Sequence, residues 1–294
     1  MRQRIIPLVL LAAAAAITIS CSAGKNPTGP SPLPEPNSTI NYTAVAASDG
    51  NGIGSSVPCV PFAGLTDCPN GKGYVYVAAS QLKAKGFMTN LTNLSVPTAV
   101  IGRDFQDLGN NHNHFVAGNF IETEAPFVAS NSTLITIFAG GNDVNVVTGA
   151  LGAGEGASDQ VGYINAQIKA FAADYTTLLN LLRTRAPSAR IVVLNLPNMG
   201  AMPFLATAPL AQRQAAQKLS VGMTTTATNP LTAQNVLVID MMCDARSYQA
   251  STYSSDGFHP SDAGYAWMAA EVVSAATTNY KSPQSSCSQM TLVP

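Results

Sequence analysis

Short apolar runs alternate with longer segments of helical periodicity from about residue 40 onward. The runs are rich in Val, Ile and Leu and lack a strict alternation of polar and apolar positions. They therefore predict strands that are covered on both faces. The predicted strands are residues 42–47, 94–97, 134–139, 190–196 and 236–240.

Two helices are predicted most clearly between and after these strands. The first begins at Ser158, read as its N-cap, and ends near Arg185, and the last follows Pro260 and Ser261. The apolar face of the first consists of Val161, Ile164, Ile168, Phe171, Tyr175, Leu178, Leu179 and Leu182. Alternating strands and helices predict a parallel sheet with right-handed crossovers, in one α/β domain over residues 40–280.

The first residues of the chain carry a different pattern. Arg2 and Arg4 precede an apolar run over residues 5–19, whose 15 residues are fewer than the roughly 20 of a membrane-spanning helix. A basic start, a short apolar run and small residues are typical of an export signal. We predict a signal over residues 1–21, a Pro-rich tether over residues 22–39 and a C-terminal tail over residues 281–294.

The cysteines indicate the cellular compartment to which the protein is transported. Residues 18–22 resemble the processing site of bacterial lipoproteins, in which the cysteine, here Cys21, becomes the lipid-bearing N-terminus. Lipidation of Cys21 would leave an even number for disulfides in an oxidising compartment, namely Cys59, Cys68, Cys243 and Cys287. Of the three connectivities, we favour Cys59 with Cys68 and Cys243 with Cys287. We expect an exported protein, attached to the membrane of a bacterial cell envelope through Cys21 or freely secreted.

Charge and composition exclude several classes of partner. Charged residues make up 11% of the chain, against about 25% in an ordinary soluble domain. Without residues 1–20 the chain has 13 basic and 16 acidic residues and no basic cluster, so we expect no nucleic-acid partner. We also predict no metal and no cofactor, because Cys-x-x-Cys is absent and His112 and His114 have no ligand partner nearby in sequence.

Three strand ends carry the candidate chemistry, because reactive groups gather at the carboxyl edge of a parallel sheet. Ser48 follows the first predicted strand and Asn142 follows two glycines after the third. Asp256 precedes His259 by three positions, between the fifth strand and the last helix. Each segment taken alone also fits an ordinary turn or a helix-capping loop.

Each residue type suits a hydrolytic role. A carboxylate three residues before a histidine can hold the imidazole tautomer while the other ring nitrogen faces outward. The amide of Asn142 is the kind of donor that an oxyanion hole requires. The order Ser, Gly-x-Asn-Asp and Asp-x-x-His closely resembles the SGNH (GDSL-type) serine hydrolases, over about residues 42–278.

The resemblance implies a flavodoxin-like fold, which is a three-layer α/β/α sandwich with a mainly parallel five-stranded sheet. It implies Ser48 as nucleophile, His259 as base and Asp256 as its partner. It also implies an oxyanion hole formed by the backbone N–H groups of Ser48 and Thr98 with the side chain of Asn142. Two positions depart from the family pattern. The first is Ala46-Ala47-Ser48-Asp49, which replaces the Gly-Asp-Ser of the family's first sequence block. The second is Thr98, which stands where the family's second block has a glycine whose backbone N–H helps to bind the oxyanion. Gly102 is the alternative donor.

The implied function is that of an exported serine esterase or lipase acting on carboxylic esters. Its substrate would be a small-molecule, lipid or acylated-carbohydrate ester, cleaved through an acyl-enzyme. A carbohydrate acetyl-esterase of the same fold is one alternative. A non-catalytic envelope lipoprotein that retains the fold is another, motivated by the two departures.

Overall fold

A computed structural model describes residues 32–59 and 68–294 of the chain. The predicted signal with Cys21 and most of the predicted tether lie outside the described residues. Five parallel strands form one sheet in the order β2-β1-β3-β4-β5. They are β1 (Thr39–Ala46), β2 (Met88–Asn93), β3 (Leu134–Phe138), β4 (Arg190–Leu194) and β5 (Leu237–Ile239). This is the flavodoxin-like strand order.

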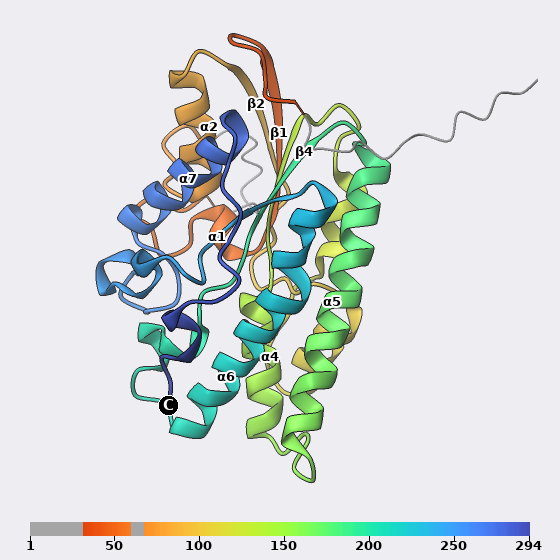
Figure 1. Cartoon of the computed structure of the whole chain (residues 1–294), viewed down its shortest axis with the longest axis vertical. Coiled ribbons are helices and arrows are strands. Elements are labelled where there is room, and N and C mark those ends of the chain that lie inside the picture. Colours follow the sequence, from red (N-terminus) through yellow and green to blue (C-terminus); the bar gives the residue numbers. More distant parts are fainter. Residues whose placement is uncertain (1–31, 60–67) are drawn as a thin grey trace, which may run out of the picture.

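Helices cover both faces of the sheet, which confirms the predicted three-layer sandwich (Figure 1). One layer contains α1 (Ser48–Asn51), α2 (Tyr74–Ala84) and α7 (Asp262–Thr277). The other contains α3 (Arg103–Asn111), α4 (Gly141–Gly152), α5 (Gln160–Arg185) and α6 (Leu210–Met223). Successive strand residues alternate between the layers, as the pleat requires: Val192 packs towards α7 and Val193 towards α5.

Short 3₁₀ and π-helical turns connect these elements. They are η2 (Phe120–Glu124), η3 (Ala125–Phe127), η4 (Met199–Ala201), η5 (Pro203–Leu205), η6 (Thr224–Thr228), η7 (Asn229–Gln234), η8 (Ala245–Tyr248), η9 (Ala250–Thr252) and η10 (Ser288–Thr291). Of these, η2 and η6 are π-helical. Among the residues described, no helix is long and apolar enough to cross a membrane.

The second strand was predicted in the wrong place. Residues 94–97 were expected, but β2 is Met88–Asn93. β2 lies at the edge of the sheet and alternates exposed and more buried positions, so it is too polar for a search based on continuous apolar runs. The predicted residues still run beside β1, because Leu94 N–H donates to Ala44 O at 2.9 Å and Val96 N–H to Ala46 O at 3.1 Å.

The two clearest helix predictions are confirmed, with a shift at one end. α5 begins one residue later than expected, because Asp159 rather than Ser158 caps it by accepting from Gly162 N–H at 2.9 Å. Its predicted apolar residues are buried except Val161, which is 58% exposed. α7 begins after Ser261, whose hydroxyl accepts from Gly264 N–H at 3.3 Å.

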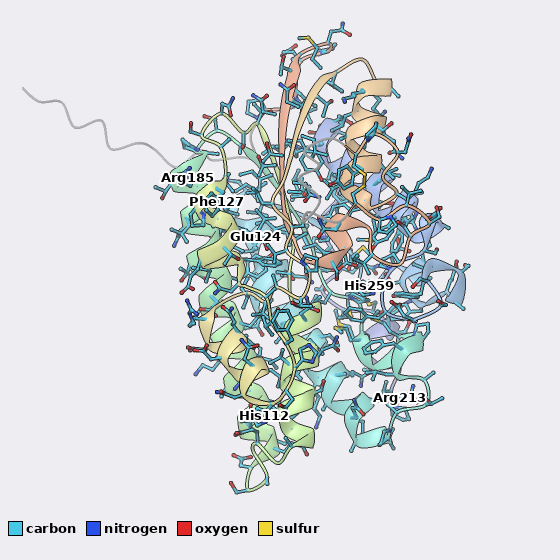
Figure 2. All side chains as sticks on the ribbon, turned by 180° about the vertical axis from the view of Figure 1, so that it is seen from behind. His112, Glu124, Phe127, Arg185, Arg213 and His259 are labelled. Carbon is cyan, nitrogen blue, oxygen red and sulfur yellow. A yellow bond between two sulfur atoms is a disulfide. The ribbon has the colours of Figure 1, made fainter. Side chains whose placement is uncertain are left out.

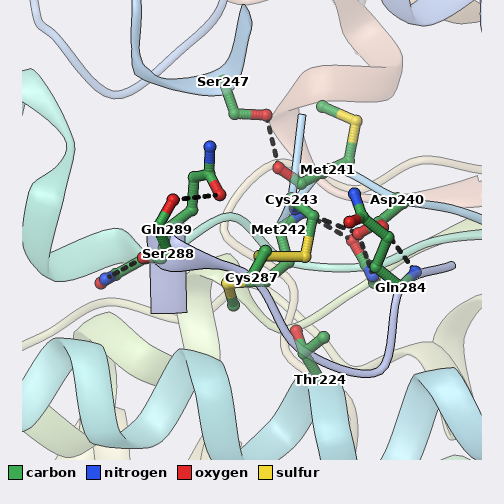
Figure 3. The surroundings of a disulfide bond; sticks show 12 residues. Thr224, Asp240, Met241, Met242, Cys243, Ser247, Gln284, Cys287, Ser288 and Gln289 are labelled. Atoms are coloured by element: carbon green, nitrogen blue, oxygen red, sulfur yellow. Dashed lines mark hydrogen bonds between the residues drawn. A yellow bond between two sulfur atoms is a disulfide. The ribbon is translucent and has the colours of Figure 1, made fainter. Parts of the chain in front are cut away.

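Both favoured disulfides are present, Cys59–Cys68 and Cys243–Cys287. The second joins the C-terminal tail to the segment after β5, where Asp240 accepts from the backbone N–H of Cys243 and of Gln284 (Figure 3). The tail then packs on α6. The disulfide thus fixes a segment that has no strand or long helix of its own.

Candidate active site

The first candidate, Ser48, begins helix α1 directly after β1 and is 6% exposed. The turn is tight because Gly50 lies against the segment after β2. A Cβ on Gly50 would lie 2.0 Å from Ser95 Oγ, which is closer than two non-bonded atoms can approach. Small residues around Ser48 therefore let the chain reverse at the carboxyl edge of the sheet and hold the hydroxyl there.

The second candidate is the turn that carries Asp256 and His259. Asp256 Oδ1 accepts from Ser254 Oγ at 2.9 Å, Phe258 N–H at 2.8 Å and His259 N–H at 2.9 Å. Asp256 Oδ2 lies 2.7 Å from His259 Nδ1. Partial burial raises the pKa of Asp256, but the hydrogen bonds, first that of His259, outweigh burial and lower the pKa to about 2. The carboxylate therefore stays ionised at neutral pH.

The two candidates meet in space. His259 Nε2 lies 2.8 Å from Ser48 Oγ, although 211 positions separate them in sequence. The Phe258 ring packs edge-on against the imidazole, with ring centroids 4.9 Å apart. With the Nδ1 proton donated to Asp256, Nε2 can accept the hydroxyl proton of Ser48, at a distance suited to general-base activation.

The third candidate, Asn142, lies in the first turn of α4. Gly140 precedes it with φ of 114°, a conformation open to glycine and strained for other residues. Asn142 Nδ2 donates to Ala99 O at 2.9 Å. An amide group has two N–H donors, and this bond uses one of them to tie Asn142 to the residue after Thr98.

Thr98 has φ of 67°, a left-handed conformation that is an outlier for a β-branched residue. Its backbone therefore adopts the conformation that glycine favours. Thr98 Oγ1 accepts from Ala117 N–H at 2.9 Å. Gly102, the alternative, precedes α3 with extended backbone, and a Cβ there would lie 2.3 Å from Asp174 Oδ2. A side chain at position 102 would therefore have to displace the Asp174 carboxyl group of α5.

Comparison with known proteins identifies the family of the chain. The sequence profile of the GDSL-like Lipase/Acylhydrolase family matches residues 62–267. The chain belongs to the GDSL-like lipase/acylhydrolase family. A search of curated proteins found no match.

Solved structures share the fold of this family member at low sequence identity. An extracellular lipase from Streptomyces rimosus has a TM-score of 0.55 and 17% identity, with 81% of this chain and 100% of that chain covered. Phospholipase A1 from Streptomyces albidoflavus has a TM-score of 0.54 and 17% identity, with 81% of this chain and 99% of that chain covered. The lipase Lip_vut3 from a goat rumen metagenome has a TM-score of 0.52 and 17% identity, with 82% of this chain and 99% of that chain covered.

An apolar pocket of this lipase/acylhydrolase lies beside Asn142 and extends along the ends of β3, β4 and β5. Its walls include Phe120, Leu196, Met199, Met202, Phe258 and Trp267. Asp49, which follows Ser48, also lines the pocket. Burial raises the pKa of Asp49, and the nearby His259 lowers it in part. Sequence patterns did not reveal the pocket, because its walls come from many separate segments.

Two further acids were not predicted as part of the site. Asp143 Oδ1 accepts from Ile101 N–H at 2.9 Å, and burial raises the pKa of Asp143 to about 7. Glu124 Oε2 accepts from Ala46 N–H at 3.0 Å. Asp143 is the last residue of the Gly-x-Asn-Asp segment, whereas nothing in the sequence around Glu124 marks it as a site residue.

The His-x-His pair lies away from Ser48, His259 and Asp256. His112 follows α3, and its Nε2 lies 3.3 Å from Glu155 Oε1. Figure 2 shows His112 well apart from His259. Within residues 32–59 and 68–294, no group of three or more His, Cys, Asp or Glu side chains is arranged to hold a metal ion.

Proposed function

We propose that this family member is an exported serine esterase or lipase that hydrolyses carboxylic esters through Ser48, His259 and Asp256. The observation that carries the proposal is the continuous hydrogen-bonded chain from carboxylate to hydroxyl. His259 Nδ1 lies 2.7 Å from Asp256, and His259 Nε2 lies 2.8 Å from Ser48 Oγ. Membership of a lipase/acylhydrolase family supports the same chemistry. An intact triad disfavours a purely binding role.

The reaction begins when His259 Nε2 takes the proton of Ser48 and the hydroxyl oxygen attacks the ester carbonyl. Negative charge develops on the carbonyl oxygen, where the N–H groups of Ser48 and Thr98 and the amide of Asn142 stabilise it. His259 then protonates the leaving alcohol. Water, deprotonated by His259, releases the acyl group from Ser48. Asp256 stays ionised throughout and stabilises the imidazolium.

The apolar pocket favours a hydrocarbon acyl chain over an acetyl group. Partly exposed walls such as Phe138 and Phe258 would remove methylene groups of the acyl chain from water, which is favourable. The structures of similar fold include an extracellular lipase and a phospholipase A1. We therefore place acyl esters of fatty-acid type ahead of acetylated carbohydrates. Rates on p-nitrophenyl esters of increasing chain length, compared with acetylated xylan, separate these classes.

Export is supported by the two disulfides, which persist in oxidising compartments. Attachment through Cys21 stays a prediction, because Cys21 lies outside the described residues. Mass spectrometry of the mature N-terminus tests it. A lipid-modified Cys21 would show attachment, and an unmodified N-terminus would show free secretion.

A fluorophosphonate probe tests the nucleophile directly. We expect the wild-type protein to be labelled and Ser48→Ala to be neither labelled nor active on p-nitrophenyl esters. Ser188→Ala, a change on an exposed loop before β4, serves as the matched control and should behave as wild type. Labelling that persists in Ser48→Ala would overturn the assignment.

A further inference from the structure

Glu124 is fully buried, with 0% of its surface exposed, and the proposed reaction does not use it. It is the last residue of the π-helical turn η2. Such turns are rare in proteins overall but occur often at functional sites. In Figure 2 it lies among the central side chains, whereas Phe127, three positions later, is 66% exposed. A buried carboxyl group normally needs a specific partner.

The partner of Glu124 is the backbone at the end of β1. Glu124 Oε2 accepts from Ala46 N–H at 3.0 Å, and Ala46 lies two positions before Ser48. The carbonyl oxygen of Ala46 accepts from Val96 N–H at 3.1 Å, and Val96 lies two positions before Thr98. One peptide segment, held by Glu124, therefore joins the two chain segments whose N–H groups would bind the oxyanion.

The carboxyl group accepts a backbone hydrogen bond here, in surroundings that disfavour its charged form. Burial raises the pKa of Glu124 well above its usual range, and the N–H groups of Ala46 and Val96 offset this only in part. Among the described residues, no cation is a cause of this shift in pKa. Ionisable groups on the elements packed around Glu124 include Tyr42 of β1 and Asp174 and Tyr175 of α5. Tyr74 of α2 interacts with Glu124 electrostatically, and the Glu122–Arg103 ion pair lies at the same turn.

We propose that Glu124 is a positioning residue for acyl transfer, which sets the backbone donors of Ser48 and Thr98 through its hydrogen bond to Ala46. The proposal rests on the function proposed above. The oxyanion forms only in the transition state, so misplaced donors reduce kcat and leave KM nearly unchanged. A displacement of about 1 Å can cost about 10²-fold in rate.

The test compares two substitutions of similar volume. Glu124→Met fills the space but removes the acceptor, and we expect kcat to fall about 10²-fold. Glu124→Gln keeps an uncharged acceptor oxygen, so its kcat should stay within about threefold of wild type. Glu122→Gln, in the same turn but exposed, is the matched control and should change nothing. Rates are expressed per Ser48 labelled by the fluorophosphonate probe, so that unfolded protein does not count.

Several outcomes would overturn the proposal. One is Glu124→Met with wild-type kcat, and another is Glu124→Gln as impaired as Glu124→Met or unable to fold. If Glu124→Met does not fold, Glu124→Asp withdraws the acceptor by one methylene and should show the same loss of kcat. Failure of the proposed function looks different, because then wild type and Glu122→Gln would show neither labelling nor hydrolysis.

Discussion

The base turn, residues 254–261, and the oxyanion segment, residues 94–102, would serve the same reaction but are held in different ways. In the base turn, Asp256 binds groups two or three positions away in sequence. The oxyanion segment is held by side chains from far along the chain. Asn142 binds Ala99 O across 43 positions, and Asp143 binds Ile101 N–H across 42.

This difference separates the roles of local and distant contacts. The geometry of the base turn follows from its own sequence, so most of its defects should appear in proton transfer. The geometry of the oxyanion segment depends on α4 and on the end of β1, so its defects should appear as lost transition-state stabilisation or as lost stability. Substitutions in each region test this separation.

Asp256→Asn should have the largest effect in the base turn. The amide keeps the shape of the side chain but does not stabilise the imidazolium or hold the required tautomer, so kcat should fall by about 10⁴. Initial rates on p-nitrophenyl esters measure the loss. Asp262→Asn, in the first turn of α7, also removes a hydrogen-bonded carboxylate and should leave kcat unchanged. A loss of less than tenfold in Asp256→Asn would contradict the proposed role.

Asn142→Ala should have the next largest effect, now in the oxyanion region. Removal of one oxyanion donor typically lowers kcat by about 10²–10³. Asn142→Asp is nearly the same size but offers no N–H donor, so it should lose at least as much activity. If Asn142→Asp instead keeps wild-type kcat in steady-state assays, the amide does not stabilise the oxyanion.

Asp143→Asn should change the pH dependence of stability more than activity. Burial raises the pKa of Asp143 from 3.8 to about 7, so the folded state binds a proton that the unfolded state has released. The resulting stability is fully present below about pH 4 and is lost as pH rises through about 7. Asparagine does not titrate but still offers Ile101 N–H an acceptor oxygen.

Urea unfolding at several pH values between about 4 and 8 measures this effect. The free energy of unfolding of the wild type, relative to Asp143→Asn, should fall as pH rises through that interval. Other buried acids, including Glu124, are present in both proteins. Their contributions to the free energy of unfolding therefore cancel in the difference. Parallel curves would show that Asp143 keeps an ordinary pKa.

The same contrast explains what sequence analysis predicted. The Asp-x-x-His spacing and the Gly-x-Asn-Asp segment are local patterns, and strands β3, β4 and β5 are short apolar runs. Edge strand β2 contains too many polar residues to be detected as a short apolar run. Glu124 reaches Ala46 across 78 positions, a contact that only the folded chain creates. The pocket walls come together for the same reason.

Thr98→Gly should have the smallest effect on activity, because a backbone donor does not depend on the side chain. Glycine adopts φ of 67° without the strain that threonine carries there. It loses the hydrogen bond from Ala117 N–H to Thr98 Oγ1, so the gain in stability should be at most about 1 kcal/mol. We expect kcat within about threefold of wild type by steady-state assay, with thermal unfolding as the measure of stability.

Gly102→Ala tests whether the glycine at position 102 serves packing alone. Its Cβ would lie 2.3 Å from Asp174 Oδ2, which is the end of a partly exposed side chain. The carboxylate can turn away, so thermal stability should fall only slightly. Activity per labelled Ser48 should stay near that of wild type, because Gly102 would only pack. A loss of kcat of tenfold or more in Gly102→Ala would contradict a pure packing role, because the backbone N–H of position 102 is unchanged by the substitution. The start of α3 would then have to contribute to the geometry of the site.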